Sequence, residues 1–129
     1  MIYENDRLTL TGSTTQLERF FIKIGILSER TVNEGMIVGG GRITYYLSSM
    51  LLELGMAVKI IELNKEKCIN LVEKFPQATV IHGDGTDHEL LLSESLKEMD
   101  AFIALTENDE ENVIISMFSQ IHGVTHVLP

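Results

Sequence analysis

The amino-acid sequence predicts an α/β domain with a doubly wound parallel sheet. Strand and helix patterns alternate from residue 34 onward, the strand patterns are apolar on both faces, and three consecutive glycines follow the first of them. Alternation at this spacing implies parallel strands joined by right-handed crossovers. Strands that are apolar on both faces are typical of a sheet covered by helices on its two sides. We expect the strand order 3-2-1-4-5, with a ligand crevice outside the carboxyl ends near strands 1 and 4.

The first half of this domain is expected to contain two strands and two helices. Residues 36–39 (MIVG) predict a short buried strand, and residues 57–62 (AVKIIE) predict a second one. Gly55 ends the helix between them, and Pro76 prevents the second helix from continuing. The side chains expected to face the sheet are Ile43, Leu47, Met50, Leu51 and Leu54 in the first helix, and Cys68, Leu71, Val72 and Phe75 in the second.

The second half is expected to complete a five-stranded sheet. Residues 78–83 (ATVIHG) and 100–106 (DAFIALT) predict the third and fourth strands, with a short helix over residues 87–99 between them. A fourth helix follows, and THVLP predicts the start of a fifth strand. The side chains expected to face inward from the fourth helix are Ile114, Met117, Phe118 and Ile121.

The first 33 residues do not fit this alternation. DRLTLTG predicts one strand, and the spacing of Leu17, Phe20, Phe21 and Ile24 predicts one face of a helix. A lone strand and helix cannot bury their apolar surfaces by themselves. We therefore interpret residues 1–33 as the carboxyl-terminal remnant of a preceding domain, residues 34–129 as the α/β domain truncated after its fifth strand, and the chain as part of a longer protein.

Composition and charge argue against several classes of partner. The chain has 129 residues, 44% of them hydrophobic, and a net charge of −9. Binding to nucleic acid or to an anionic membrane surface needs clustered positive charge, which this sequence lacks. Its apolar runs are shorter than the ~18–20 residues of a membrane span, so we expect a soluble domain without direct membrane insertion. One cysteine suits a reducing cytoplasm, and the four histidines lack metal-ligand spacing.

The glycine run has the context of a phosphate-binding loop. The first N–H groups of a helix lack partners, and the helix dipole adds partial positive charge there. Gly39 is expected to make the tight turn, and Gly41 to let a pyrophosphate approach the backbone. Thr44 stands where the third glycine of the GxGxxG pattern is usual. We expect its side chain to loosen the packing of helix on strand, its hydroxyl to bond back into the helix, and nucleotide affinity to suffer.

Glu62 supports the same interpretation, because it ends the second strand 21 positions after Gly41. An acid about 20 residues beyond the glycines usually accepts hydrogen bonds from the adenosine ribose in dinucleotide-binding domains. A carboxylate there repels a 2′-phosphate. The sequence therefore favours NAD or an adenine nucleotide over NADP.

Several polar residues near the expected crevice have both a functional and a structural interpretation. Arg42 is either a phosphate contact or a solvated surface residue, although a cation at a helix N-terminus is unfavourable without a nearby anion. Asp84 and Asp87 either contact the ligand or only make a turn and cap the next helix. For Asp87 the helix cap is the favoured interpretation. His82 lies near enough for a ligand contact, while Cys68 is expected in the core.

Longer motifs resemble a known family. MIVGGGRITYYLSSMLLELGMAVKIIELNKEKC, VIHGDGTDHELL and MDAFIALTENDEENVIISM closely resemble the nucleotide-binding RCK domain (TrkA-N) of TrkA-type potassium-uptake proteins. GGGR, GDGTD and ALTxxDExN together are more specific than the glycine loop alone. The segment NDRLTLTGSTTQLERFFIKIG resembles the close of the carboxyl-side RCK domain of this family. That order suggests the second half of a tandem TrkA chain.

The resemblance implies a cytoplasmic regulator and not an enzyme. Members of this family form rings at the inner face of the membrane, on a potassium-translocating Trk subunit, and bind NAD, NADH, ATP or ADP to control potassium flux. It also implies a Rossmann-like fold and a homo-oligomer, either a dimer or a larger ring. The positions that match the nucleotide site of the family are Gly39, Gly40, Gly41, Arg42, Ile43, Glu62, Asp84, Gly85, Thr106 and Glu107.

The sequence is also compatible with two other functions. The same fingerprint serves hydride transfer, so the chain could be a fragment of an NAD-dependent oxidoreductase, although no acid–base pair for it is visible in the sequence. It could also be an oligomerisation module whose nucleotide site has decayed. Thr44 motivates this alternative, as does the lack of the basic residue that the family often places after the fifth strand.

Overall fold

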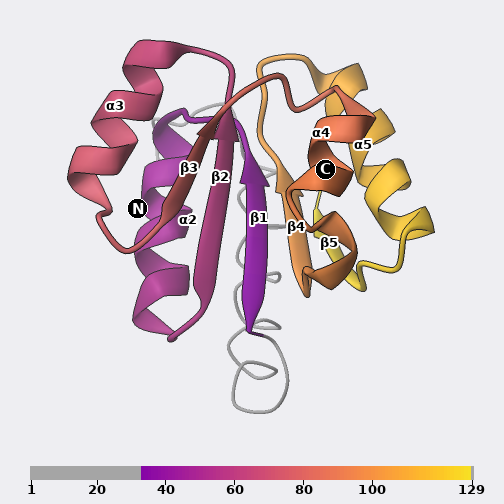
Figure 1. Ribbon diagram of the computed structural model, residues 1–129, viewed down its shortest axis with the longest axis horizontal. Coiled ribbons are helices and arrows are strands. Elements are labelled where there is room, and N and C mark those ends of the chain that lie inside the picture. Colours follow the sequence, from indigo (N-terminus) through magenta and orange to yellow (C-terminus); the bar gives the residue numbers. More distant parts are fainter. Residues whose placement is uncertain (1–32, 129) are drawn as a thin grey trace, which may run out of the picture. The chain divides into compact units, whose positions relative to one another are not determined.

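The computed structural model describes residues 33–128, so the strand and helix expected within residues 1–33 lie outside the described part. The described chain alternates strands and helices from end to end (Figure 1). Its elements are β1 (Glu34–Val38), α2 (Arg42–Glu53), β2 (Ala57–Glu62), α3 (Lys65–Lys74), β3 (Thr79–His82), α4 (His88–Ser93), the short 3₁₀ helix η1 (Leu96–Glu98), β4 (Ala101–Ala104), α5 (Asp109–Ile121) and β5 (His126–Leu128).

The five strands form one parallel sheet in the order β3-β2-β1-β4-β5, which confirms the predicted topology. In this order β1 is central, and Val38 near its carboxyl end pairs with Ile61 of β2 and Ala104 of β4. The loops that follow β1, β2 and β4 therefore leave the sheet at the same edge. Figure 1 shows α2 and α3 toward the β3 side and α4 and α5 toward the β5 side.

The central strands are buried on both faces, as the apolar strand patterns predict. Met36, Ile37 and Val38 of β1 are at most 2% exposed, and every residue of β4 is buried. Alternate residues of a strand point to opposite faces, so burial of successive residues requires cover on both sides. One apolar core cluster joins strands β1, β2 and β4 to the crossover helices and contains Met36, Val38, Ile61, Leu91, Leu96, Met99, Phe102, Ala104, Ile115 and Val124.

Four side chains of α5 were predicted to face inward, and this prediction was wrong for three of them. Ile114 and Met117 are each 56% exposed, Ile121 is 78% exposed, and Phe118 is half-buried. The buried residues of this helix are instead Asn112, Ile115, Ser116 and Ser119. Asn112 turns inward because its side-chain amide bonds to the loop after β4, and helical periodicity then places Ile115, Ser116 and Ser119 on the same face. The buried face of α5 therefore carries small polar residues beside Ile115, whereas hydrophobic periodicity predicts large apolar side chains on the buried face.

Smaller departures occur in the other helices. Val72 and Leu54, both expected to face the sheet, are 52% and 41% exposed, and Leu54 is the C-cap that follows the last residue of α2. The single helix expected over residues 87–99 is interrupted after α4, where Ser95 adopts a left-handed conformation with φ 71°. Lys59 of β2 supports this break by donating from Nζ to the Glu94 carbonyl at 3.0 Å.

The orientation of α5 is testable with two adjacent and chemically identical substitutions. Ile115 is fully buried and Ile114 is 56% exposed. We expect Ile115→Ala to lower the free energy of unfolding by about 2–5 kcal/mol, because it leaves a cavity in the core. Ile114→Ala should change it by about 0.5 kcal/mol or less. Urea denaturation of both variants measures the difference, and equal losses would contradict the described orientation.

Candidate functional site

The turn after β1 is pressed between its two neighbouring strands. The Gly39 N–H donates to the Ile61 carbonyl of β2 at 2.8 Å, and the Leu105 N–H after β4 donates to the Val38 carbonyl at 2.7 Å. Gly39 has φ +114°, and a Cβ atom there would collide with the Leu105 carbonyl. Both the backbone conformation and the close approach require glycine, as the sequence predicts for the tight turn.

The other two glycines differ in what surrounds them. A Cβ atom on Gly40 would lie 2.8 Å from Oε1 of Glu62, so the absence of a side chain lets this carboxylate approach the loop. Among the described residues, a Cβ atom on Gly41 would meet nothing within 4 Å. Gly41 is the N-cap of α2 and supplies no side chain to the first N–H groups of that helix, and Arg42 begins the helix in an exposed position. Residues 33–128 therefore leave room for a side chain at Gly41, beside the amino end of α2.

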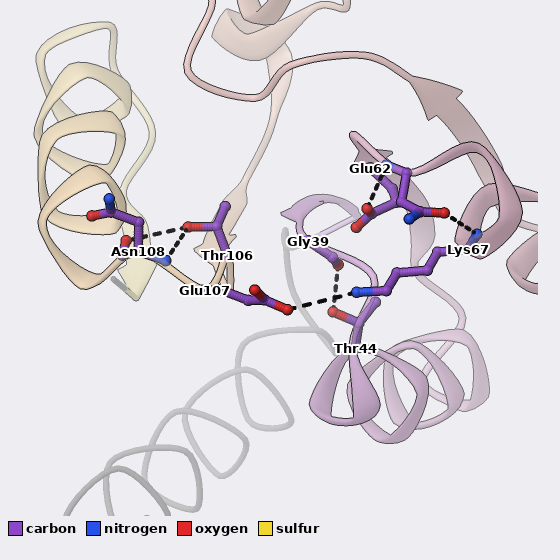
Figure 2. A network of polar contacts seen from close by, with 8 residues as sticks. Gly39, Thr44, Glu62, Lys67, Thr106, Glu107 and Asn108 are labelled. Carbon is purple, nitrogen blue, oxygen red and sulfur yellow. Dashed lines mark hydrogen bonds and ion pairs between the residues drawn. The ribbon is translucent and has the colours of Figure 1, made fainter.

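Thr44 does not bond back within α2 as expected. Its side chain is fully buried, and Oγ1 donates at 2.5 Å to the carbonyl of Gly39, five residues earlier (Figure 2). The hydroxyl thus fastens the first turn of the helix to the glycine loop. A glycine at this position could not make such a bond, so Thr44 stabilises the loop conformation.

Glu62 lies beside the glycine loop, where spacing alone predicts it. The residue is 7% exposed, and its Oε2 accepts from the Asn64 N–H at 2.7 Å, while Oε1 is the oxygen near Gly40. The Sγ of Cys68 donates to the Glu62 carbonyl at 3.4 Å. Burial, and to a lesser extent the Glu62 charge, raises the pKa of the Cys68 thiol, which agrees with its predicted place in the core.

The loop after β3 also reaches the end of β1. Gly85 is buried, and a Cβ atom there would overlap the side chain of Val38. Asp84 accepts from the backbone N–H of Thr86 at 2.9 Å and from its hydroxyl at 2.7 Å; these bonds, the first more strongly, lower the pKa of the Asp84 carboxyl. Asp87 caps α4, as expected, by accepting from the Glu89 N–H.

Two further polar residues near this edge make structural contacts. His82 bonds through Nε2 to the Leu63 carbonyl at 3.0 Å, so this nitrogen carries the proton and joins the ends of β3 and β2. Asn112, which the sequence interpretation missed, accepts from the Thr106 N–H at 3.0 Å and from its hydroxyl at 2.5 Å, and returns a bond to the Thr106 carbonyl. Thr106 and Asn112 therefore stabilise the loop after β4. The sequence feature that could have indicated this contact is the six-residue separation of the Thr and the Asn in ALTENDEEN.

Glu107 lies next to Thr106, at the mouth of the site. Its side chain is 96% exposed, and Oε2 lies 3.8 Å from Nζ of Lys67 on α3 (Figure 2). Lys67 is a second residue near the site that sequence reasoning missed. Among the described residues, 33–128, no group of three or more His, Cys, Asp or Glu side chains is placed to hold a metal ion.

Comparison with known proteins identifies the family. Residues 35–128 match the TrkA-N domain. The chain belongs to the TrkA-N domain family. This confirms the family resemblance, and the TrkA-N match covers every strand and helix described above except the first residue of β1.

Relatives of this TrkA-N domain carry the names of potassium uptake proteins. The chain is 31% identical over 131 residues to the Trk system potassium uptake protein TrkA homolog 2 of Methanosarcina mazei, covering 98% of this chain and 28% of that protein. It is 40% identical over 100 residues to TrkA of Halomonas elongata, covering 78% of this chain and 22% of that protein. The chain thus spans less than a third of the length of these relatives.

A solved structure shares the fold. The NAD(P)-binding domain of an exopolyphosphatase-related protein from Archaeoglobus fulgidus superposes with a TM-score of 0.58 at 19% identity, covering 74% of this chain and 86% of that one. At this identity the likeness supports the Rossmann-like architecture. Within residues 33–128, none of the helices combines the length and hydrophobicity that crossing a bilayer requires.

The role of Thr44 in this TrkA-N domain is testable by removing its hydroxyl without changing its shape. We expect Thr44→Val to lower the free energy of unfolding by about 1–3 kcal/mol, because the buried Gly39 carbonyl loses its donor. Thr44→Ser keeps the donor and removes one methyl group, so its loss should be smaller, about 1 kcal/mol. Thermal or urea denaturation gives both values; a Thr44→Val variant as stable as the parent would show that the hydroxyl contributes nothing.

Proposed function

We propose that this TrkA-N domain is a nucleotide-binding regulatory domain of a Trk-type potassium uptake system. Its ligand is NAD or NADH, with ATP and ADP as the alternatives, and its site comprises the glycine loop, Glu62 and the loops after β3 and β4. The proposal rests mainly on one observation: the amino end of α2 lacks the side-chain cap that the other α-helices in the described chain have.

Helices α3, α4 and α5 each begin with a side-chain cap. Asn64, Asp87 and Asn108 accept from N–H groups of the first turn, and each of these helices also has at least one acid in that turn. Helix α2 begins at Gly41 with no side-chain cap and no acid in its first turn, and Arg42 adds a positive charge. Unpaired N–H groups, the helix dipole and a cation together favour an anion at this end.

Glu62 supports a nucleotide, and not only a phosphate, as the ligand of this site. Its carboxylate lies beside Gly40, so one strand away from the proposed phosphate position there is an acceptor for ribose hydroxyls. The negative charge disfavours the 2′-phosphate of NADP. Because adenosine ribose and diphosphate are common to NAD, ATP and ADP, this part of the site supports all three ligands.

The regulatory part of the proposal is supported by the names of the relatives. We infer that the domain acts in the cytoplasm as a non-enzymatic regulator and reaches the inner face of the membrane through a Trk potassium-translocating subunit. Residues 1–33 are proposed to belong to a preceding RCK-C-like domain, and residues 34–129 to an RCK-N domain. Ligand then controls flux insofar as it binds one state of the assembly better than another.

Self-association is part of the same proposal. Ile114, Met117 and Ile121 lie on one exposed side of α5, and such apolar surface is typical of protein contacts. The alternative of a decayed nucleotide site loses one of its motives, because Thr44 supports the glycine loop and leaves the space before Gly41 open.

Calorimetric titration of the purified chain with NAD, NADH, ATP and ADP tests the proposed ligand class. We expect saturable binding of at least one of the four, with the nucleotide recovered unchanged after prolonged incubation. Absence of heat with all four would overturn nucleotide binding, and conversion of the bound nucleotide would overturn the non-enzymatic role.

Gly41 provides a substitution that separates stability from binding. Gly41→Asp places a carboxylate in open space as a helix cap, so the free energy of unfolding should stay unchanged or rise by up to about 1 kcal/mol. The same carboxylate occupies the N–H groups that the phosphates need and repels them, so nucleotide affinity should fall at least about tenfold.

Gly41→Asn is the matched control, because it caps the same N–H groups without charge. We expect an intermediate loss of affinity, which denaturation and calorimetry of both variants will separate from any change in folding. A Gly41→Asp variant that binds nucleotide as tightly as the parent would place the ligand elsewhere.

A further inference from the structure

An ion pair crosses the mouth of the glycine loop. Lys67 lies in the first turn of α3, after β2, and Glu107 lies in the loop after β4, with 3.8 Å between Nζ and Oε2. Because β1 lies between β2 and β4 in the sheet, this contact joins elements that follow the two strands on either side of β1. Figure 2 shows the Lys67 side chain extended from α3 toward Glu107, and in this view the line of the ion pair passes between Gly39 and Thr44.

The position of Lys67 favours a nearby anion. Cations are unfavourable in the first turn of a helix, where the dipole is positive, and the Lys67 backbone N–H already bonds to the Asn64 cap at 3.1 Å. Its side chain leaves the helix and points to a carboxylate on the opposite side of the mouth. Glu107 is a weak partner, because its side chain is 96% exposed and water and salt screen such a pair.

A nucleotide diphosphate is a stronger partner for the same ammonium group. It would bring its negative charge to the amino end of α2, whereas Glu107 adds a carboxylate that opposes this charge. The two members of the ion pair therefore have opposite effects on an anion at the mouth. Lys67 is thus a cation near the glycine loop in a chain that lacks the basic residue which the family often places after the fifth strand.

We propose that Lys67 is a phosphate-binding residue that Glu107 holds in the ligand-free state. Resting on the proposed nucleotide function, the inference adds a residue and a local change: when a diphosphate occupies the glycine loop, the Lys67 ammonium exchanges the Glu107 carboxylate for phosphate oxygens. The contact between α3 and the loop after β4 then opens. The negative charge of the ligand thereby removes a contact between α3 and the loop after β4.

Two single substitutions that should change nucleotide affinity in opposite directions test this exchange. Calorimetry of the purified chain with ADP and with NAD should show about tenfold weaker binding for Lys67→Met, which keeps the apolar stem and loses the charge-assisted bond. Glu107→Gln should bind both ligands more tightly, by about threefold, because it removes both a competitor and a like charge. A purely structural ion pair would shift affinity in the same direction in both variants.

Lys65→Met is the matched control, since Lys65 carries the same charge in the same turn of α3. We expect it to change affinity less than about twofold. Lys67→Met with unaltered affinity, or Lys65→Met with an equal loss, would overturn the contact with phosphate while leaving nucleotide binding by the parent chain intact. If the parent chain binds none of NAD, NADH, ATP and ADP, the proposed function fails, and this inference with it.

Discussion

Three loops meet at the carboxyl edge of the sheet so closely that Gly39, Gly40 and Gly85 have no room for a side chain. A Cβ atom on Gly39 would strike the Leu105 carbonyl, one on Gly40 would press on Glu62, and one on Gly85 would overlap Val38. This steric constraint fixes the path of the chain after β1 and directs the uncapped end of α2 toward the open space at Gly41. The remaining features of the site depend on it, because Glu62 and the loop after β4 take their positions against the same backbone.

The sheet and the phosphate loop were predictable because their signals are local. Strands apolar on both faces specify a covered parallel sheet, and the spacing from Gly41 to Glu62 reflects one β–α–β unit. The buried face of α5 was not predictable from hydrophobicity, since Asn112 is recruited inward by backbone groups six residues earlier. Nor could sequence show that Thr44 bonds to Gly39 or that Lys67 reaches Glu107, because both contacts depend on how loops pack.

The family assignment and the geometry bear on different levels of function. Membership of the TrkA-N domain family and relatives named as potassium uptake proteins support a regulatory role, while the residues at the sheet edge support the ligand class. A nucleotide in this position would contact both sides of the central strand, with Glu62 on the β2 side and the Glu107 loop on the β4 side. Binding can then alter how the two sides are linked, which is the physical requirement for a ligand that shifts a conformational equilibrium.

The central claim is that unpaired amides at the start of α2 hold a diphosphate. NMR titration of the ¹⁵N-labelled chain with NAD measures this directly, through the amide signals of Gly40, Gly41 and Arg42. The account predicts that these signals shift together and saturate at one dissociation constant, while the amides of Glu34 and Asp100 at the opposite edge stay in place. NAD binding that leaves the three signals unmoved would contradict it, and so would the absence of any shift with NAD, NADH, ATP and ADP, each at millimolar concentration.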